Sequence, residues 1–430
     1  MAPRPRNKSL GLLELVAIAL GGMVGGGIFT ILGISADMVG YWTPVAIALG
    51  GGVAALAAYS YVKLGVLYRD EGATYAFMKR SFPSSSVAAA IVGWTVIFGY
   101  ISTLALYAYT FAAYAAGAIE FEHPDLARSG IAALVLLLFA VINLVSVRGM
   151  GRIEDLLVYT KLIVLAFIAT VLVAHGDVSE LAELRVHEVS AGAILTVASI
   201  TFVAYEGFQL VINAVNEMEN PERNIPRAIY LAILLVVLIY VGIAIAALAA
   251  IPLEDLARSK EDALAAGAAD AIGVWGRRLV VFGAILATSS AISGTVFGSS
   301  RQMAAIADDG FFPRWLSRRG SDGIPRVAIV TMTLTAILLI FSGGLRLILE
   351  FGSITFLLVS FLTAYANHHV RERSGAHTSL TVGAMVGLGV ATVLILVYEA
   401  THQPEQLVFI LAVYALLAVG AIAYGRRRSR

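Results

Sequence analysis

The stretch Gly21-Gly22-Met23-Val24-Gly25-Gly26-Gly27-Ile28-Phe29 decides how this chain folds, because it places five glycines inside the first long apolar run. Each glycine in a helix costs roughly 1 kcal/mol relative to alanine, so a cluster makes the helix easy to interrupt. An interruption inside a bilayer frees backbone N–H and C=O groups, and each freed group needs a partner. The stretch therefore predicts either close packing against neighbouring helices or a binding site.

The composition indicates a polytopic, all-α membrane protein. Of the 430 residues, 59% are hydrophobic and 14% are charged, whereas soluble domains carry about 25% charged residues. The chain has no cysteine, which excludes disulfides and thiolate chemistry, and its histidines have no metal-binding context. No nucleotide-binding lysine loop or hydrolase motif is present, so we expect no enzyme, no metal, no cofactor and no nucleic-acid partner.

A membrane-spanning helix needs about 20 apolar residues, and this criterion predicts twelve spans in the sequence. They cover residues 11–36, 43–66, 86–118, 130–147, 153–175, 191–215, 226–250, 276–306, 325–342, 347–369, 379–398 and 405–424. The gaps between them leave no room for a soluble domain.

The distribution of Lys and Arg predicts the orientation of the spans. If the N-terminus is cytoplasmic, 22 of the 30 basic residues fall on the cytoplasmic side, 7 on the other side, and Lys161 inside a span. Basic residues favour the cytoplasmic side of a membrane. The chain is therefore expected to be a multi-pass protein of the cell membrane with both termini in the cytoplasm.

The sixth span carries a second interruption. It reads Thr201-Phe202-Val203-Ala204-Tyr205-Glu206-Gly207-Phe208-Gln209, with a charge and a glycine in the middle of an apolar run. The first span runs outward and the sixth runs inward. Two units of opposite orientation, each opening with a broken helix, are the pattern of an inverted repeat.

The predicted organisation follows from this symmetry. It consists of a cytoplasmic tail (1–9), a first repeat (10–175), a second repeat (191–370), two peripheral helices (378–424) and a basic cytoplasmic tail (425–430).

Unwinding both broken helices at the same depth would bring four half-helix ends together. Helix N-termini present N–H groups that suit a carboxylate, while freed carbonyls and Glu206 suit an ammonium group. A zwitterionic amino acid has both charges. The alternative is that the small residues only allow helices to pack closely.

Two charged residues lie within apolar spans. Lys161 is roughly 9 Å along its helix from Asp155, and it is expected to be paired, neutral or next to a cavity unless it extends to the interface. Burial disfavours the charged form of lysine, so Lys161 is a candidate proton carrier. Glu206 could receive a substrate amine, carry a proton or pair with a cation such as Lys161. The hydroxyls of Thr288, Ser289 and Ser290 either bond to backbone carbonyls or bind an ion.

Four sequence elements resemble signatures of the amino acid–polyamine–organocation superfamily. They are Gly25-Gly26-Gly27-Ile28-Phe29, Phe202-Val203-Ala204-Tyr205-Glu206-Gly207-Phe208, Glu219-Asn220-Pro221-Glu222-Arg223-Asn224-Ile225-Pro226-Arg227-Ala228-Ile229 and Asp309-Gly310-Phe311-Phe312-Pro313. Within that superfamily, the chain is most similar to ApcT-like proton-coupled amino acid permeases. The resemblance implies the LeuT-type fold, with ten core helices in two inverted five-helix repeats and two peripheral helices.

The resemblance also implies roles for individual residues. Lys161 stands where these permeases carry a fifth-helix lysine, beside the first and eighth helices, and is expected to couple the proton. Substrate carboxylate is expected at the amides around Gly25–Gly27, and substrate amine at carbonyls of the first and sixth helices. The predicted substrate-binding residues are Gly22, Met23, Gly25, Gly26, Gly27, Phe202, Ala204, Tyr205, Glu206 and Gly207.

These observations predict a secondary transporter that takes up amino acids with a proton by alternating access. Glu206 departs from the apolar residue of several relatives, and a carboxylate there favours cationic substrates or a second proton. An alternative is therefore an exchanger of basic amino acids or polyamines with Glu206 as the cation receptor. A third alternative, from another class, is a membrane sensor that binds amino acids without transporting them. A sodium site at Thr288, Ser289 and Ser290 would compete for space with Lys161.

Overall fold

The structure is a computed structural model that describes residues 10–116, 124–145, 150–176, 189–258, 263–320 and 323–428. Every regular element in these ranges is a helix, and a single backbone bridge pairs Leu10 with Met218. The predicted tail 1–9 and the last two residues of the basic tail lie outside the described residues.

The helices of the first half follow the predicted spans closely. They are α1 (Leu12–Met23), α2 (Gly27–Val39), η1 (Gly40–Trp42), α3 (Thr43–Tyr68), α4 (Ala73–Ser81), α5 (Ser86–Ala116), α6 (Pro124–Val145) and α7 (Met150–His175).

The second half begins with another interrupted segment. Its elements are α9 (Ala191–Ile200), η2 (Thr201–Tyr205), α10 (Leu210–Asn213), α11 (Pro221–Ala250), α12 (Leu253–Arg258), α13 (Ala263–Ile272), α14 (Val274–Asp308), η3 (Arg314–Ser317), α15 (Arg326–Ser342), α16 (Leu345–His369), α17 (Arg371–Ser374), α18 (Thr378–His402) and α19 (Pro404–Arg428).

Within the described residues, ten helical segments are long and apolar enough to cross a membrane. Two further apolar helices, α1 with 12 residues and α15 with 17, are shorter. Helices therefore occupy all twelve predicted regions, and twelve as the number of membrane crossings stays a prediction.

Two features of the second half differ from the sequence-based expectation. Helix α11 begins at Pro221, before the predicted start at residue 226, because proline fits the first helical turn, where no backbone N–H is needed. The gap 251–275, expected as a loop, contains the short helices α12 and α13. The sequence of α13 is rich in alanine, the strongest helix former.

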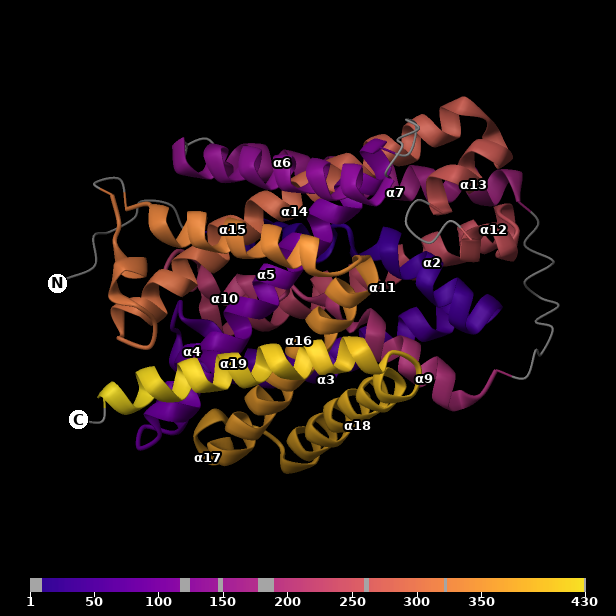
Figure 1. Ribbon diagram of the computed structural model, residues 1–430. Helices are drawn as coiled ribbons and strands as arrows, with labels where there is room; N and C mark the ends of the chain where they lie inside the picture. The colour runs from indigo at the N-terminus through magenta and orange to yellow at the C-terminus, as the bar shows by residue number, and fades with distance from the viewer. Residues whose placement is uncertain are drawn as a thin grey trace.

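The broken and central helices are covered by more exposed ones. In an apolar 18-residue stretch of each segment, 94% of the residues are buried in α9–α10 and 83% in α16, whereas only 17% are buried in α19. In Figure 1, α6 runs along the upper edge of the bundle, and α18 and α19 run along the lower edge. The exposed faces of α6 and α19 are apolar, with Leu134 and Leu416 among their most exposed side chains. This surface suits contact with lipid.

The first and sixth segments run in opposite directions past each other. Gly22 lies against Gly207, and Gly27 lies against Ala204. Residue numbers thus rise along one segment where they fall along the other. Opposite direction is what an inverted repeat requires, and the complete repeat of five and five helices stays a prediction.

We expect Gly207→Ala to destabilise the protein. Gly207 has φ of +130°, and a Cβ there would lie 2.4 Å from the backbone carbon of Gly22. The backbone conformation alone costs about 1–3 kcal/mol for a residue with a side chain. Thermal unfolding of the purified protein in detergent measures the effect.

The matched control is Gly242→Ala in α11, where an added Cβ meets nothing within 4 Å. This control should be neutral or slightly stabilising, since alanine is the better helix former. Equal melting temperatures for the two variants would contradict the close approach of the two segments.

Candidate functional site

Both predicted interruptions are present. Helix α1 ends at Met23 and α2 begins at Gly27, with the Val24 N–H bonded back to Leu20 O at 2.9 Å. In the sixth segment, Glu206 has extended backbone after η2, and Gly207 follows with positive φ. The two breaks lie against each other through Gly22 and Gly207. We call this region the paired break.

Side chains from three other helices bond to the carbonyls at the C-terminus of α1. Tyr107 of α5 donates to Gly22 O at 2.8 Å, and Tyr240 of α11 donates to Met23 O at 2.8 Å. Lys161 of α7 donates to Gly21 O at 3.2 Å and to Val24 O at 2.5 Å. Four successive carbonyls at this helix end therefore have donors, as backbone inside a bilayer requires.

Lys161 connects three helices. Its ammonium group is wholly buried, and besides the α1 carbonyls it donates to Ser290 Oγ of α14 at 2.8 Å. A lysine at the centre of a span costs about 2.5–3.5 kcal/mol, while each hydrogen bond from a charged donor returns about 1.5–3 kcal/mol. Three such bonds offset the cost, so Lys161 is stably held in the interior rather than extended to the interface.

The three candidate hydroxyls of α14 divide into different roles. Ser290 accepts the Lys161 bond and donates to Ala287 O at 3.1 Å. Thr288 donates to Ala284 O of its own helix at 2.6 Å. This is the bond to a backbone carbonyl that the sequence analysis considered as the alternative to ion binding. Of this set, Ser290 is the hydroxyl that is hydrogen-bonded to the ammonium group.

The N-terminus of α2 presents backbone amides at the paired break. The first N–H groups of an α-helix have no acceptor within the helix, and they carry partial positive charge. Here they belong to Gly26, Gly27 and Ile28. Thr30 Oγ1 bonds to Gly26 O at 3.2 Å and contacts Thr110 Oγ1 at 2.9 Å, which fixes the start of the helix.

The glycines of the first break also pack closely against neighbouring helices. An added Cβ would lie 2.7 Å from Ala291 Cβ at Gly25, 2.7 Å from Thr110 Oγ1 at Gly26 and 2.7 Å from Ala204 Cβ at Gly27. The packing interpretation is thus correct for these positions. Packing and anion binding use different atoms of the glycines, so a binding role stays a prediction.

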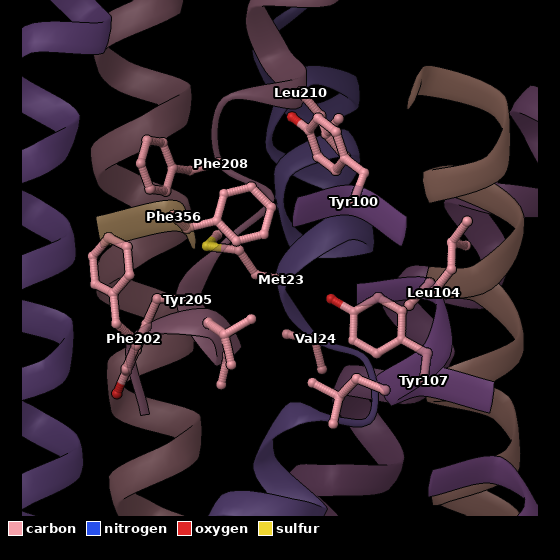
Figure 2. Close-up of a cluster of buried hydrophobic side chains, with 14 of the residues drawn as sticks. Met23, Val24, Tyr100, Leu104, Tyr107, Phe202, Tyr205, Phe208, Leu210 and Phe356 are labelled. Carbon is pink, nitrogen blue, oxygen red and sulfur yellow. The ribbon is translucent and has the colours of Figure 1, made fainter. Parts of the chain in front are cut away.

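Aromatic and apolar side chains close the paired break from solvent. Figure 2 shows Met23 extending toward Phe208 and Phe356, while Tyr100 and Tyr107 approach from α5. None of these side chains is more than 3% exposed. The structure therefore represents a conformation in which the predicted site has no open path to solvent through these residues.

Two predicted binding residues point elsewhere. The Tyr205 hydroxyl donates to Ile47 O of α3 at 2.7 Å, and its ring packs on Tyr240. Phe202 lies beside Tyr205 in Figure 2. Among the predicted binding residues of the sixth segment, Ala204 and Gly207 lie against glycines of the first break, and Leu210 further along the segment also contacts Gly22.

Glu206 is buried and only partly satisfied. Its Oε2 accepts from Gln209 Nε2 at 2.6 Å, and its Oε1 has no hydrogen-bond partner. Gln209 also donates to Tyr100 OH at 3.2 Å and accepts from the Gly207 N–H at 3.1 Å. The ion pair with Lys161 considered from the sequence is not among these contacts.

Sequence reasoning missed Tyr240 and Gln209. Tyr240 places a hydroxyl in the middle of an apolar span, where it must find an acceptor, and Gln209 follows Glu206 by three residues on the same short turn. Both polar residues can be recognised in the sequence. Their partners, Met23 O and Tyr100 OH, cannot be recognised there, because they depend on how separate helices pack.

Comparison with known proteins identifies the family. The family model described as amino acid permease matches residues 10–422. This chain belongs to the amino acid permease family. An uncharacterized protein of Methanocaldococcus jannaschii is 33% identical over 73% of this chain and 72% of its own length. The inner membrane transport protein YbaT of Escherichia coli is 29% identical over 98% of both chains.

An uncharacterized transporter of Mycobacterium tuberculosis is 29% identical over 73% of this chain and 69% of its own length. The predicted superfamily is confirmed, and the permease is a transporter rather than an enzyme. Its long apolar helices agree with a multi-pass membrane protein.

We expect Tyr240→Phe to destabilise the permease, because Met23 O and Ala204 O lose the hydroxyl that bonds them at 2.8 and 3.2 Å. An unsatisfied buried polar group costs about 1–3 kcal/mol. Thermal unfolding in detergent measures the loss. Tyr230→Phe, on the same helix but 38% exposed, is the control and should have no effect.

Proposed function

We propose that this permease moves amino acids together with a proton, by alternating access at the paired break. The observation that carries the proposal is the position of Lys161, whose Nζ bonds to Gly21 O, Val24 O and Ser290 Oγ. A titratable group thus holds the first break against α7 and α14.

Loss of the proton changes what Lys161 can do. An ammonium has three N–H donors, whereas the neutral amine has two and a lone pair that carbonyls do not bind. Bonds from a charged donor are also roughly twice as strong as neutral ones. Deprotonation therefore weakens the connection between α1, α7 and α14, and biases a two-state movement of the break.

The substrate class follows from the two half-helix ends. The amides of Gly26, Gly27 and Ile28 suit a carboxylate at the N-terminus of α2. Substrate amine would bind carbonyls of the two breaks, which retain a second lone pair after bonding to Tyr107, Tyr240 and Lys161. The membership of the chain in the amino acid permease family supports this assignment.

The glycine contacts support movement at the break. Gly22 lies against the backbone of Gly207, and Gly27 lies against the small side chain and backbone of Ala204. Such surfaces can separate without disrupting a packed core. On the Lys and Arg distribution, we place both termini on the cytoplasmic side of the cell membrane.

Lys161→Ala is expected to reduce proton-driven uptake by about tenfold or more, since a coupling free energy of about 1–3 kcal/mol corresponds to about 5–150-fold. Uptake of a panel of amino acids into proteoliposomes, with and without a pH gradient, measures it. The control is Lys63→Ala, which removes a partly exposed lysine bonded to Gly375 O. Full gradient-driven uptake by Lys161→Ala would refute the proposed coupling.

A second candidate function rests on Glu206. Its Oε1 is buried without a partner near the paired break, and a cationic substrate would supply both charge and donors. The permease would then exchange basic amino acids or polyamines. A buried carboxylate without a partner favours cationic substrates, because any other substrate leaves the carboxylate oxygen without a hydrogen-bond donor.

Glu206→Gln separates the two candidates. If Glu206 receives cations, the variant should lose transport of arginine and putrescine by about tenfold or more while retaining alanine, since each unpaired buried charge costs several kcal/mol. Competition uptake assays in proteoliposomes provide the measurement, with the exposed Glu14→Gln as control. Equal effects on all three substrates would exclude Glu206 as a cation receptor.

A further inference from the structure

A second group of buried charged residues lies away from the paired break, where α16 packs against α18. Glu350 of α16 and Glu399 of α18 are both 0% exposed. Arg346 brings them together, because its guanidinium group bonds to Glu350 and to Tyr398, the residue next to Glu399, and the two carboxyl groups are close enough to interact. Two carboxylates in contact repel each other strongly in an apolar setting, so they cannot both be ionised without compensation.

One cation reaches this pair. Arg346 Nε donates to Glu350 Oε1 at 2.7 Å, and another guanidinium nitrogen donates to the Tyr398 hydroxyl. One guanidinium neutralises one carboxylate. Glu399 receives no hydrogen bond from Arg346, and its charge is therefore not balanced.

The unsatisfied oxygens point to the same conclusion. Glu350 Oε2 and both carboxyl oxygens of Glu399 have no donor. A protonated carboxyl group has one O–H donor of its own. If Glu399 is protonated, its O–H can donate a hydrogen bond to Glu350 Oε2. One proton then removes the excess negative charge and gives an oxygen of each residue a hydrogen-bond partner.

Among the described residues, the neighbouring helices supply no second positive charge that could balance Glu399. Helices α5 and α9 carry no charged side chain, and Tyr100 of α5 packs edge-to-face on Phe356 of α16. The basic residues of three other neighbouring helices lie at the other end of the bundle. They are Lys63 of α3, Lys79 and Arg80 of α4 and Arg326 of α15. Beside the pair itself, α18 contributes His402, stacked on Tyr398, and α19 contributes Tyr414 and the exposed Glu405.

The same segment of α16 holds the sixth-segment break. Ser353, one turn after Glu350, donates to Ile200 O at 2.5 Å and accepts from the Val203 N–H at 3.4 Å. Ser102 of α5 donates to Ile348 O at 2.7 Å. The pair is thus connected through a single helical turn to η2.

We propose that Glu350 and Glu399 form a proton-binding site that holds one shared proton between α16 and α18. The proton fastens α18 to the part of α16 that positions η2. The site is separate from Lys161, and it stands whether or not Lys161 carries the transported proton.

Infrared spectroscopy of the purified full-length protein tests the site directly. At neutral pH, the wild-type protein should show a protonated-carboxyl C=O band that Glu399→Gln loses and the exposed-residue control Glu405→Gln retains. Glu399→Gln keeps the Arg346–Glu350 ion pair, which favours folding. Glu206→Gln, which leaves the pair intact, should also retain the band.

Thermal unfolding over a range of pH provides the second measurement. A proton held only by the folded protein makes the folding constant fall about tenfold per pH unit, from the ordinary glutamate pKa of about 4.3 up to the pH at which the folded site releases its proton. Wild type should therefore lose stability as pH rises, and Glu399→Gln should lose this part of the dependence. An absent band in Glu206→Gln, or the same band and the same pH dependence in wild type and Glu399→Gln, would overturn the proposal.

Discussion

The structure depends on one constraint, which is that backbone polar groups freed inside a membrane must find partners within the protein. At the end of α1, three side chains bond to four successive carbonyls. These side chains are Tyr107, Tyr240 and Lys161, from α5, α11 and α7. Without them, the break would expose carbonyls to an apolar interior. The surrounding helices are arranged so that these donors reach one point.

The sequence predicted the location of both breaks because glycine and a central charge are local signals. It also predicted that Lys161 would need partners, since an ammonium inside an apolar span is costly. Lengths of apolar runs were enough to place the long helices. The short helices α12 and α13 escaped prediction because they lie between spans, where length and hydropathy give no signal.

Partner choice could not be predicted in the same way. Whether Lys161 would meet Glu206 or the α1 carbonyls depends on the angle at which α7 crosses α1, and no local pattern encodes that angle. The same holds for Glu350 and Glu399, which are 49 residues apart in a chain where each looks like an isolated charge. A polar residue within an apolar span predicts that a partner exists, whereas the packing of the helices determines which residue that partner is.

The three donors at the end of α1 come from helices that are themselves unbroken, and this arrangement has a consequence for design. The glycines make bending possible over a stretch of several residues, but they do not select one residue as the bend. The tyrosines and the lysine make that selection, because each holds a particular carbonyl. Transplanting the glycine stretch alone into another helical bundle would yield a loosely flexible helix, whereas a hinge with a defined position requires its external donors as well.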